Sequence, residues 1–217
     1  MNISFRGNQD LIRSVEKGSR LLLSEKNLGE IPAMTFLLEE SSENAVSSIE
    51  KKGDACTIRF QEPAQYFRLF NYALHHSSED FSLEEKPYFS RRGFMLDCSR
   101  NAVAKPGKLK SLVRRLAKMG MNQLFLYMED TYEVPDYPYF GTYRGRYTRV
   151  ELRDLDKYCA LFGIELIPCV QTLAHLHSFL RWHNSEALRD TGDILKVGAE
   201  EVYTFIRSLL TSLKSCF

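Results

Sequence analysis

Polar side chains follow three short apolar runs of the chain, 93–97, 123–128 and 164–170. The polar residues that end these runs or come just after them are Asp97, Arg100, Glu129, Asp130, Gln171, Thr172 and His175. Carboxylates and an imidazole can accept and donate protons, and an arginine offers five fixed hydrogen-bond donors. Three such sets at three successive strand ends predict one shared site.

Each of these residues also has an ordinary structural interpretation. Asp97 can cap the loop that follows it, and Arg100 can pair with a surface acid. Glu129-Asp130 can be solvated loop residues, and His175 can be a satisfied core residue or the start of a helix. Trp182, the only tryptophan, is open to plain packing or to a role as a platform for the apolar face of a sugar.

Strand and helix patterns alternate three times from residue 88 onward. Each apolar run precedes a helical pattern with apolar residues three and four positions apart. The expected helices include 109–116 and begin again at Thr148 and near Ala199. Thr148 and Glu151 have the spacing of a capping box. The continuous apolar runs are typical of parallel strands buried on both faces.

An eightfold barrel and a doubly wound sheet both fit this alternation. No glycine fingerprint follows any of the three runs, which disfavours a dinucleotide-binding sheet. A barrel carries its working groups at the carboxyl ends of its strands and needs about 250 residues. We therefore predict an α/β fold in which 88–217 form the first three βα units of an incomplete (β/α)8 TIM barrel. The outer strands of such a piece have bare edges.

Residues 1–87 predict a small α+β domain ahead of the barrel. Strands are expected at 20–24, 34–38, 46–50 and 56–60. The segment 51–54 supplies turn residues for a hairpin, and Pro63 suits the first turn of a helix. The polar segment 77–87 is expected to be a linker.

Composition excludes several classes of protein. Apolar residues make up 44% of the 217, and 29 basic residues balance 28 acidic ones without a basic stripe, so nucleic acid is not an expected partner. The N-terminus lacks a signal-peptide pattern, and no apolar run is long enough to cross a membrane. The five cysteines are odd in number and lack metal-ligand or redox spacing. These features predict a reduced, cytoplasmic protein.

Three histidines raise the question of a metal site: His175, His177 and His183. No acid stands at the helical spacing that makes a zinc site, and an isolated His-x-His is a weak signal. We expect no metal and no other cofactor. A metal-dependent barrel enzyme acting on another small substrate stays open as an alternative.

The sequence Arg91–Arg100, RRGFMLDCSR, resembles the first barrel strand of glycoside hydrolase family 20. That strand reads arginine-glycine, three apolar residues, aspartate, any residue, serine and arginine. The segment 121–130, with its two terminal acids, resembles the second strand. The segment 171–175 resembles the third-strand loop with its histidine. The N-terminal segment is similar to the α+β domain that precedes the barrel in this family.

The resemblance implies a β-N-acetylhexosaminidase type of enzyme that releases terminal N-acetylglucosamine or N-acetylgalactosamine from glycosides. Its retaining mechanism is substrate-assisted. Arg92 and Asp97 match framework residues, and His175 matches a residue that supports catalysis. The residues that the resemblance and the aromatic chemistry assign to substrate binding are Arg100, Glu129, Asp130 and Trp182.

Two departures and one gap qualify the resemblance. The acid pair of the family is two aspartates, whereas the first acid here is Glu129. Gln171 replaces an aspartate, and a neutral amide cannot stabilise an imidazolium as a carboxylate does. These departures indicate a divergent, cytoplasmic branch. The family's catalytic Asp-Glu pair ends the fourth strand, and no such dipeptide follows His175. We therefore expect a truncated, inactive chain that self-associates through uncovered barrel edges. The alternative is a non-catalytic sugar-binding or interaction protein.

Overall fold

The computed structural model describes residues 3–25 and 31–217. The chain divides into two compact units, each described by itself below. Unit 1 consists of Met1–Phe94, Ser111–Gln123 and Tyr158–Glu165. Unit 2 consists of Met95–Lys110, Leu124–Lys157 and Leu166–Phe217.

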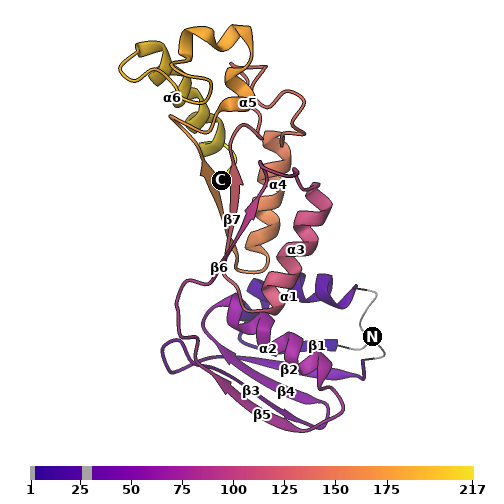
Figure 1. Cartoon of the computed structure of the whole chain (residues 1–217). Helices are drawn as coiled ribbons and strands as arrows, with labels where there is room; N and C mark the ends of the chain where they lie inside the picture. The colour runs from indigo at the N-terminus through magenta and orange to yellow at the C-terminus, as the bar shows by residue number, and fades with distance from the viewer. Residues whose placement is uncertain (1–2, 26–30) are drawn as a thin grey trace. The chain divides into compact units, whose positions relative to one another are not determined.

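Unit 1 contains a five-stranded sheet with the strand order β1-β2-β4-β3-β5 (Figure 1). The strands are β1 (Ile3–Gly7), β2 (Met34–Glu40), β3 (Ser47–Lys52), β4 (Ala55–Phe60) and β5 (Phe81–Glu85). β1, β2 and β4 are parallel, whereas β3 runs antiparallel to β4 and β5. The predicted hairpin is confirmed as β3 and β4. Its turn contains Gly53 at a φ of +58°, a conformation that glycine adopts without strain.

Two helices, α1 (Gln9–Leu23) and α2 (Pro63–His75), pack on one face of this sheet (Figure 1). Burial alternates along β2, where Met34, Phe36 and Leu38 are buried, because successive side chains of a strand point to opposite faces. The ring centroids of Phe36 and Phe70, a residue of α2, lie 4.9 Å apart. The core of unit 1 therefore lies between the sheet and these helices.

Two sequence predictions for this region are wrong. The expected strand 20–24 is the end of α1, because Ile12, Val15 and Leu22 recur at helical spacing on its buried face. The expected linker 77–87 contains β5, which pairs with β3 at the edge of the sheet. An edge strand tolerates polar side chains, because one of its edges faces solvent. The sequence of β5 is therefore as polar as that of a linker.

The second sheet has the order β6-β7-β8, formed by Gly93–Asp97, Gln123–Met128 and Glu165–Val170. The backbone N–H of Asn122, just before β7, donates to Arg92 O just before β6 at 3.0 Å. The N–H of Cys98, just after β6, donates to Tyr127 O near the end of β7, also at 3.0 Å. The starts of β6 and β7 are therefore paired with each other, and so are their ends. The two strands are parallel, as predicted.

The alternation of strands and helices is also confirmed. α3 (Pro106–Lys118) follows β6 and α4 (Arg149–Ala160) follows β7. After β8 come the one-turn helix α5 (His177–Leu180), a 3-10 turn at His183–Leu188, and α6 (Glu200–Lys214). The capping box is present, because Thr148 N donates to Glu151 Oε2 at 2.8 Å and Glu151 N donates to Thr148 Oγ1 at 3.2 Å. Within the described residues, no helix has the length and apolar character that a membrane span requires.

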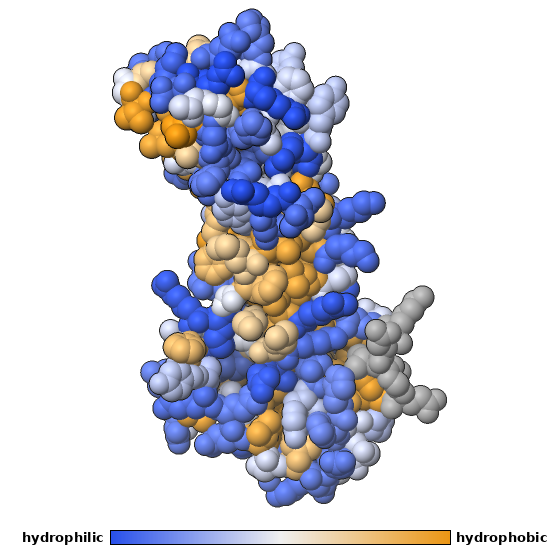
Figure 2. All heavy atoms as spheres, viewed as in Figure 1, coloured by the Kyte–Doolittle hydropathy of each residue, from blue (hydrophilic) through white to orange (hydrophobic). Residues whose placement is uncertain are grey.

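Burial differs between the strands of this sheet. In β7, Leu124, Leu126 and Met128 are fully buried, whereas in β6 Phe94 is 41% and Met95 is 56% exposed. The three buried residues of β7 lie on one face, and Phe125 and Tyr127 on its other face are half-buried. The prediction that every strand is buried on both faces is therefore met only in part by β7 and is wrong for β6, which lies at the sheet edge. Figure 2 shows hydrophobic side chains gathered on the surface over this sheet.

Candidate active site

Arg100 is the centre of a polar network at the carboxyl ends of the strands of the second sheet. Its Nε lies 2.8 Å from Glu129 Oε1, and its Nη2 lies 3.2 Å from His175 Nδ1. Because a guanidinium has donors only, His175 Nδ1 accepts, which places the proton of the neutral ring on Nε2. The structure thus brings together predicted residues that follow three different strands.

Glu129 is held from a second side by residues at the ends of the strands. Tyr127 OH donates to Glu129 Oε1 at 3.3 Å, and Gln171 Nε2 donates to Tyr127 OH at 3.0 Å. The backbone N–H of Glu129 donates to Ser99 Oγ at 2.7 Å. Gln171 therefore supports the tyrosine beside Glu129. The sequence analysis did not single out Tyr127, although the strand period of two places it on the same face as Glu129.

Asp130 is paired with Arg144, which the sequence analysis missed. Arg144 Nε lies 3.2 Å from Asp130 Oδ1, and its Nη2 donates to Ser99 O at 2.7 Å. Asp130 is only 1% exposed. Burial raises the pKa of Asp130 above its ordinary value, and the charge of Arg144 opposes that rise only in part. Arg144 lies in the loop between β7 and α4, where no periodic pattern marks it.

These side chains line a cavity of about 390 Å³ in unit 2. The volume falls in the range of about 300–1,000 Å³ that small-molecule sites occupy. The lining residues are Ser99, Arg100, Glu129, Arg144, His175, His177, Ser178 and Asp193. The side chain of Arg100 is 55% exposed, while that of Glu129 is 11% exposed, so the arginine is open to a ligand and the carboxylate is held beneath it.

The backbone at His175 is strained. Its φ is +59°, in the left-handed region that residues with a Cβ adopt rarely. Only two other non-glycine residues of the described chain share this conformation, Ala45 and Tyr143. Such strain persists where the surrounding structure holds it, and it gathers at functional sites.

Asp97 and Arg92 both form hydrogen bonds with backbone groups. Asp97 Oδ1 accepts from the N–H groups of Ser99 and Arg100 at 2.8 and 2.9 Å, which fixes the loop that carries Arg100. Arg92, in unit 1, donates through Nε to Gly120 O at 2.8 Å and through Nη1 to Phe89 O at 2.7 Å.

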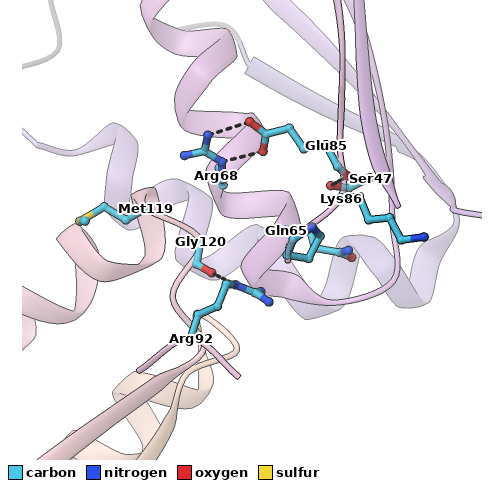
Figure 3. Close-up of a pocket in the computed structure, with 9 residues that line it drawn as sticks. Ser47, Gln65, Arg68, Glu85, Lys86, Arg92, Met119 and Gly120 are labelled. Carbon is cyan, nitrogen blue, oxygen red and sulfur yellow. Dashed lines mark hydrogen bonds and ion pairs between the residues drawn. The ribbon is translucent and has the colours of Figure 1, made fainter. Parts of the chain in front are cut away.

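Arg92 also lines a second cavity, of about 360 Å³, within unit 1 (Figure 3). There Arg68 is fully engaged with Glu85, at 2.6 and 2.7 Å from its Nε and Nη2. Figure 3 shows this pair and the bond from Arg92 to Gly120. The one carboxylate that lines this cavity is paired with an arginine, and no histidine lines it, whereas His175 and His177 line the cavity of unit 2.

Trp182 belongs to an aromatic group near α5. Its ring centroid lies 6.1 Å from those of both Tyr139 and Tyr143, and the guanidinium of Arg181 lies 4.8 Å from its centroid. Trp182 comes two residues after α5, whose residues His177 and Ser178 line the cavity. Across 3–25 and 31–217, no three His, Cys, Asp or Glu side chains are grouped to hold a metal ion.

A parallel sheet with helices between its strands and a polar cavity at the strand carboxyl ends is the arrangement expected of the first units of a (β/α) barrel. Residues 89–217 match the family described as Glycosyl hydrolase family 20, catalytic domain. The chain therefore belongs to glycoside hydrolase family 20, which confirms the resemblance found in its sequence.

The chain is also similar, over limited lengths, to proteins named as beta-hexosaminidases. The beta-hexosaminidase of Akkermansia muciniphila is 32% identical over 111 residues, which cover 43% of this chain and 22% of the relative. The probable beta-hexosaminidase of Arthroderma benhamiae is 29% identical over 106 residues, which cover 45% of this chain and 17% of the relative. The chain thus spans a minor part of either relative.

Solved structures show the fold. The family 20 β-N-acetylhexosaminidase of Streptomyces coelicolor A3(2) matches 100% of this chain with a TM-score of 0.79 and 18% identity, over 53% of its own length. The β-N-acetylhexosaminidase of Bacteroides fragilis NCTC 9343 matches 100% of this chain with a TM-score of 0.81 and 15% identity, over 50% of its length. The predicted fold, the N-terminal part of a TIM barrel preceded by a small α+β domain, is confirmed.

Proposed function

We propose that this protein acts on glycosides that end in N-acetylhexosamine, and that the cavity at the ends of β6, β7 and β8 binds the terminal sugar. The observation that carries the proposal is the joint contact of Arg100 with Glu129 and His175 at the strand ends. Membership in family 20 supplies the substrate class, in agreement with the beta-hexosaminidase names of the relatives.

The residues of the cavity have complementary roles in this proposal. Arg100 has more donors than its contacts with Glu129 and His175 use, and these bind sugar hydroxyls. Glu129 accepts from hydroxyls through the carboxylate that Arg100 and Tyr127 position. The hydrogen bond that His175 Nδ1 accepts from Arg100 fixes the orientation of the imidazole ring, and with it the direction of the proton on Nε2. Asp130 and Trp182 complete the predicted binding set, and Arg92 and Asp97 support the framework.

The proposed reaction is the retaining, substrate-assisted cleavage that the family resemblance implies. In this reaction the acetamido oxygen of the sugar attacks the anomeric carbon while an acid protonates the leaving oxygen. No Asp-Glu dipeptide follows His175 in these 217 residues. We therefore expect these residues alone to bind the sugar without cleaving it. The acid would otherwise contribute about 10²–10⁴-fold to the rate.

Further parts of the proposal concern organisation and compartment. We propose that residues 1–87 act as a supporting α+β domain and that residues 88–217 contribute the barrel site. The proposal of a reducing, cytoplasmic location is supported by the five cysteines, all of which are free thiols in the structure.

Titration of the 217-residue chain with N-acetylglucosamine, followed by NMR, tests the binding function. Arg100→Ala should weaken binding at least tenfold, because a hydrogen bond from a charged group contributes about 1.5–3 kcal/mol. Arg207→Ala is the matched control, since Arg207 is an exposed arginine on α6. Equal affinities for wild type and Arg100→Ala would remove Arg100 from the sugar site.

A second candidate function is sugar binding without catalysis, because the cavity offers exposed donors and acceptors for sugar hydroxyls, Arg100 among them. The same chain is assayed with a chromogenic N-acetylglucosaminide beside a denatured control. Turnover above the control would show that these residues contain both the acid and the acetamide-orienting group, and it would overturn the expected inactivity. Binding without turnover, in the chain extended by any residues that its gene encodes beyond Phe217, would favour the non-catalytic function.

A further inference from the structure

The cavity of unit 1 (Figure 3) is lined by an arginine with unused donors. The side chain of Arg92 is only 19% exposed. Its Nε donates to Gly120 O at 2.8 Å, and its Nη1 donates to Phe89 O at 2.7 Å. Its Nη2 carries two more N–H groups, which have no hydrogen-bond acceptor among residues 3–25 and 31–217. Glu62 Oε2 lies 3.9 Å from Nη2, beyond hydrogen-bond distance. One edge of this largely buried guanidinium is therefore open to a ligand.

Gln65 supplies a second unused donor, from α2. The residue lines the same cavity and is only 6% exposed. Its Oε1 accepts from the N–H groups of Gln61 and Glu62, both at 3.0 Å, and its Nε2 donates to Ala45 O at 2.9 Å. A side-chain amide has two N–H groups, so one N–H of this buried amide remains for a ligand in the cavity.

The acid that lines the cavity is already occupied. Both carboxylate oxygens of Glu85 accept from Arg68, at 2.6 and 2.7 Å, as Figure 3 shows. The next residue, Lys86, is exposed, and no acid of the described chain pairs with it. Even when Glu62 is set against Arg92, Lys86 leaves one positive charge unbalanced. The side chains of this cavity therefore offer mainly donors and positive charge.

We propose that this cavity binds the phosphate group of a small molecule. Phosphate is an acceptor with three strong oxygens, and these match the three side chains with unused donors, Arg92, Lys86 and Gln65. A carboxylate has only two oxygens and would leave one of these side chains without a partner. The guanidinium edge also suits phosphate, because two parallel N–H groups bind two of its oxygens.

The size and the walls of the cavity indicate a ligand larger than the free ion. Its volume of about 360 Å³ lies within the range of small-molecule sites, about 300–1,000 Å³. Pro87 and Met119 line it as well and provide apolar surface for the rest of the molecule. All of the lining residues belong to unit 1, so the site is separate from the proposed sugar site of unit 2.

The test is a titration of the 217-residue chain with inorganic phosphate and with glycerol 3-phosphate, followed by NMR. Sodium chloride keeps the ionic strength constant, which removes general screening effects. The side-chain amide signal of Gln65 and the backbone signals of Lys86 and Gly120 should shift and saturate together. Glycerol 3-phosphate should bind at least as tightly as inorganic phosphate. Weaker binding of glycerol 3-phosphate would overturn the assignment to a small molecule that carries phosphate.

Lys86→Gln should weaken the binding of both ligands about tenfold, the effect of losing one hydrogen bond from a charged group. Lys86→Arg keeps the charge and should bind as wild type does. Lys17→Gln is the matched control, because Lys17 is an exposed lysine on α1 that also belongs to unit 1 and does not line the cavity. In chloride buffer without phosphate, Lys86→Gln should melt at the temperature of wild type, which shows that its fold is intact.

The contrary outcomes are specific. Equal phosphate affinities in wild type and Lys86→Gln would mean an adventitious ion only, and so would shifts that spread over basic residues outside the cavity without saturating. Either result overturns the proposal, as does an equal loss of affinity in Lys86→Arg and Lys86→Gln. A failure of N-acetylglucosamine to bind would count against the sugar site alone, since the two cavities lie in different units.

Discussion

Arg144 Nε lies 3.2 Å from Asp130 Oδ1, while Nη2 of the same guanidinium donates to Ser99 O at 2.7 Å. One side chain therefore joins the loop after β6 to the acid pair after β7. Its Nη2 is also 3.9 Å from Glu129 Oε2. Glu129 thus stands between two arginines, Arg144 on the buried side and Arg100 on the open side of the cavity.

Arg144→Met should raise the pKa of Asp130 further. Burial is the largest cause of the raised pKa of Asp130, and the charge of Glu129 raises this pKa as well. The charge of Arg144 lowers it, and that of Arg181 lowers it slightly. Removing the strongest cation removes the main force that favours the carboxylate. Carbon-13 NMR of the Asp130 carboxyl measures the change. Arg144→Lys keeps the charge and should give a smaller shift; equal pKa values in wild type and Arg144→Met would show that the pair is electrostatically unimportant.

The burial of Asp130 predicts a pH-dependent stability. Because the pKa of Asp130 is raised in the folded protein, the folded state keeps a proton that the unfolded chain has lost above about pH 4. The free energy of unfolding contributed by this group therefore falls as pH rises through that window. Asp130→Asn removes the effect, so wild type should lose stability relative to this variant between about pH 4 and neutrality. Urea unfolding of both proteins at several pH values measures it, and a difference that is constant with pH would contradict the cause.

Gly141 provides a matched test of the loop that carries Arg144. A Cβ on Gly141 would lie 2.2 Å from the backbone oxygen of Asp130, at a φ of +73°. Gly145 has a similar φ of +70°, and its Cβ would meet nothing nearer than 3.8 Å. Both changes to alanine cost about 1–3 kcal/mol for the left-handed backbone. Only Gly141→Ala should add a steric cost, about 1–3 kcal/mol more.

Chemical unfolding of the two alanine variants isolates that difference. Gly141→Ala should also displace Arg144 and Asp130, and so weaken the binding of N-acetylglucosamine, whereas Gly145→Ala should bind as wild type does. If the two variants are equally stable and bind equally well, the close approach between Gly141 and Asp130 does not hold the loop.

Elements with a strong local pattern were predictable from the sequence. The hairpin of β3 and β4, the helix start at Pro63 and the βα alternation after residue 88 all follow from short-range spacing. The errors lie where long-range pairing decides. The apolar triplet before Ser24 has a strand composition, yet it ends α1 because residues a helical turn or two earlier share its buried face. The polar alternation of β5 is stabilised by its pairing with β3.

The part of the candidate site that lies directly after the strands was predictable from the sequence. Arg100, Glu129 and His175 each follow an apolar run, and parallel strands bring such positions together. Arg144, Tyr139 and Tyr143 lie in the long loop between β7 and α4, whose path depends on backbone contacts such as that between Gly141 and Asp130. No sequence period reports those contacts, so the positions of these residues required the structure.

The exposed edge strand β6 gives the last prediction. Phe94 and Met95 are 41% and 56% exposed, and an apolar edge strand is a template for pairing with another chain. We expect the 217-residue chain to associate at raised concentration. Met95→Lys should reduce that association, because a charged side chain on an edge strand opposes strand pairing. Val150→Lys is the matched control, since Val150 is 71% exposed on α4 and away from any strand edge. Sedimentation velocity over a range of concentrations measures the mass of both variants and of wild type. A chain that remains monomeric at all concentrations, or equal association of the two lysine variants, would show that β6 is not the associating surface.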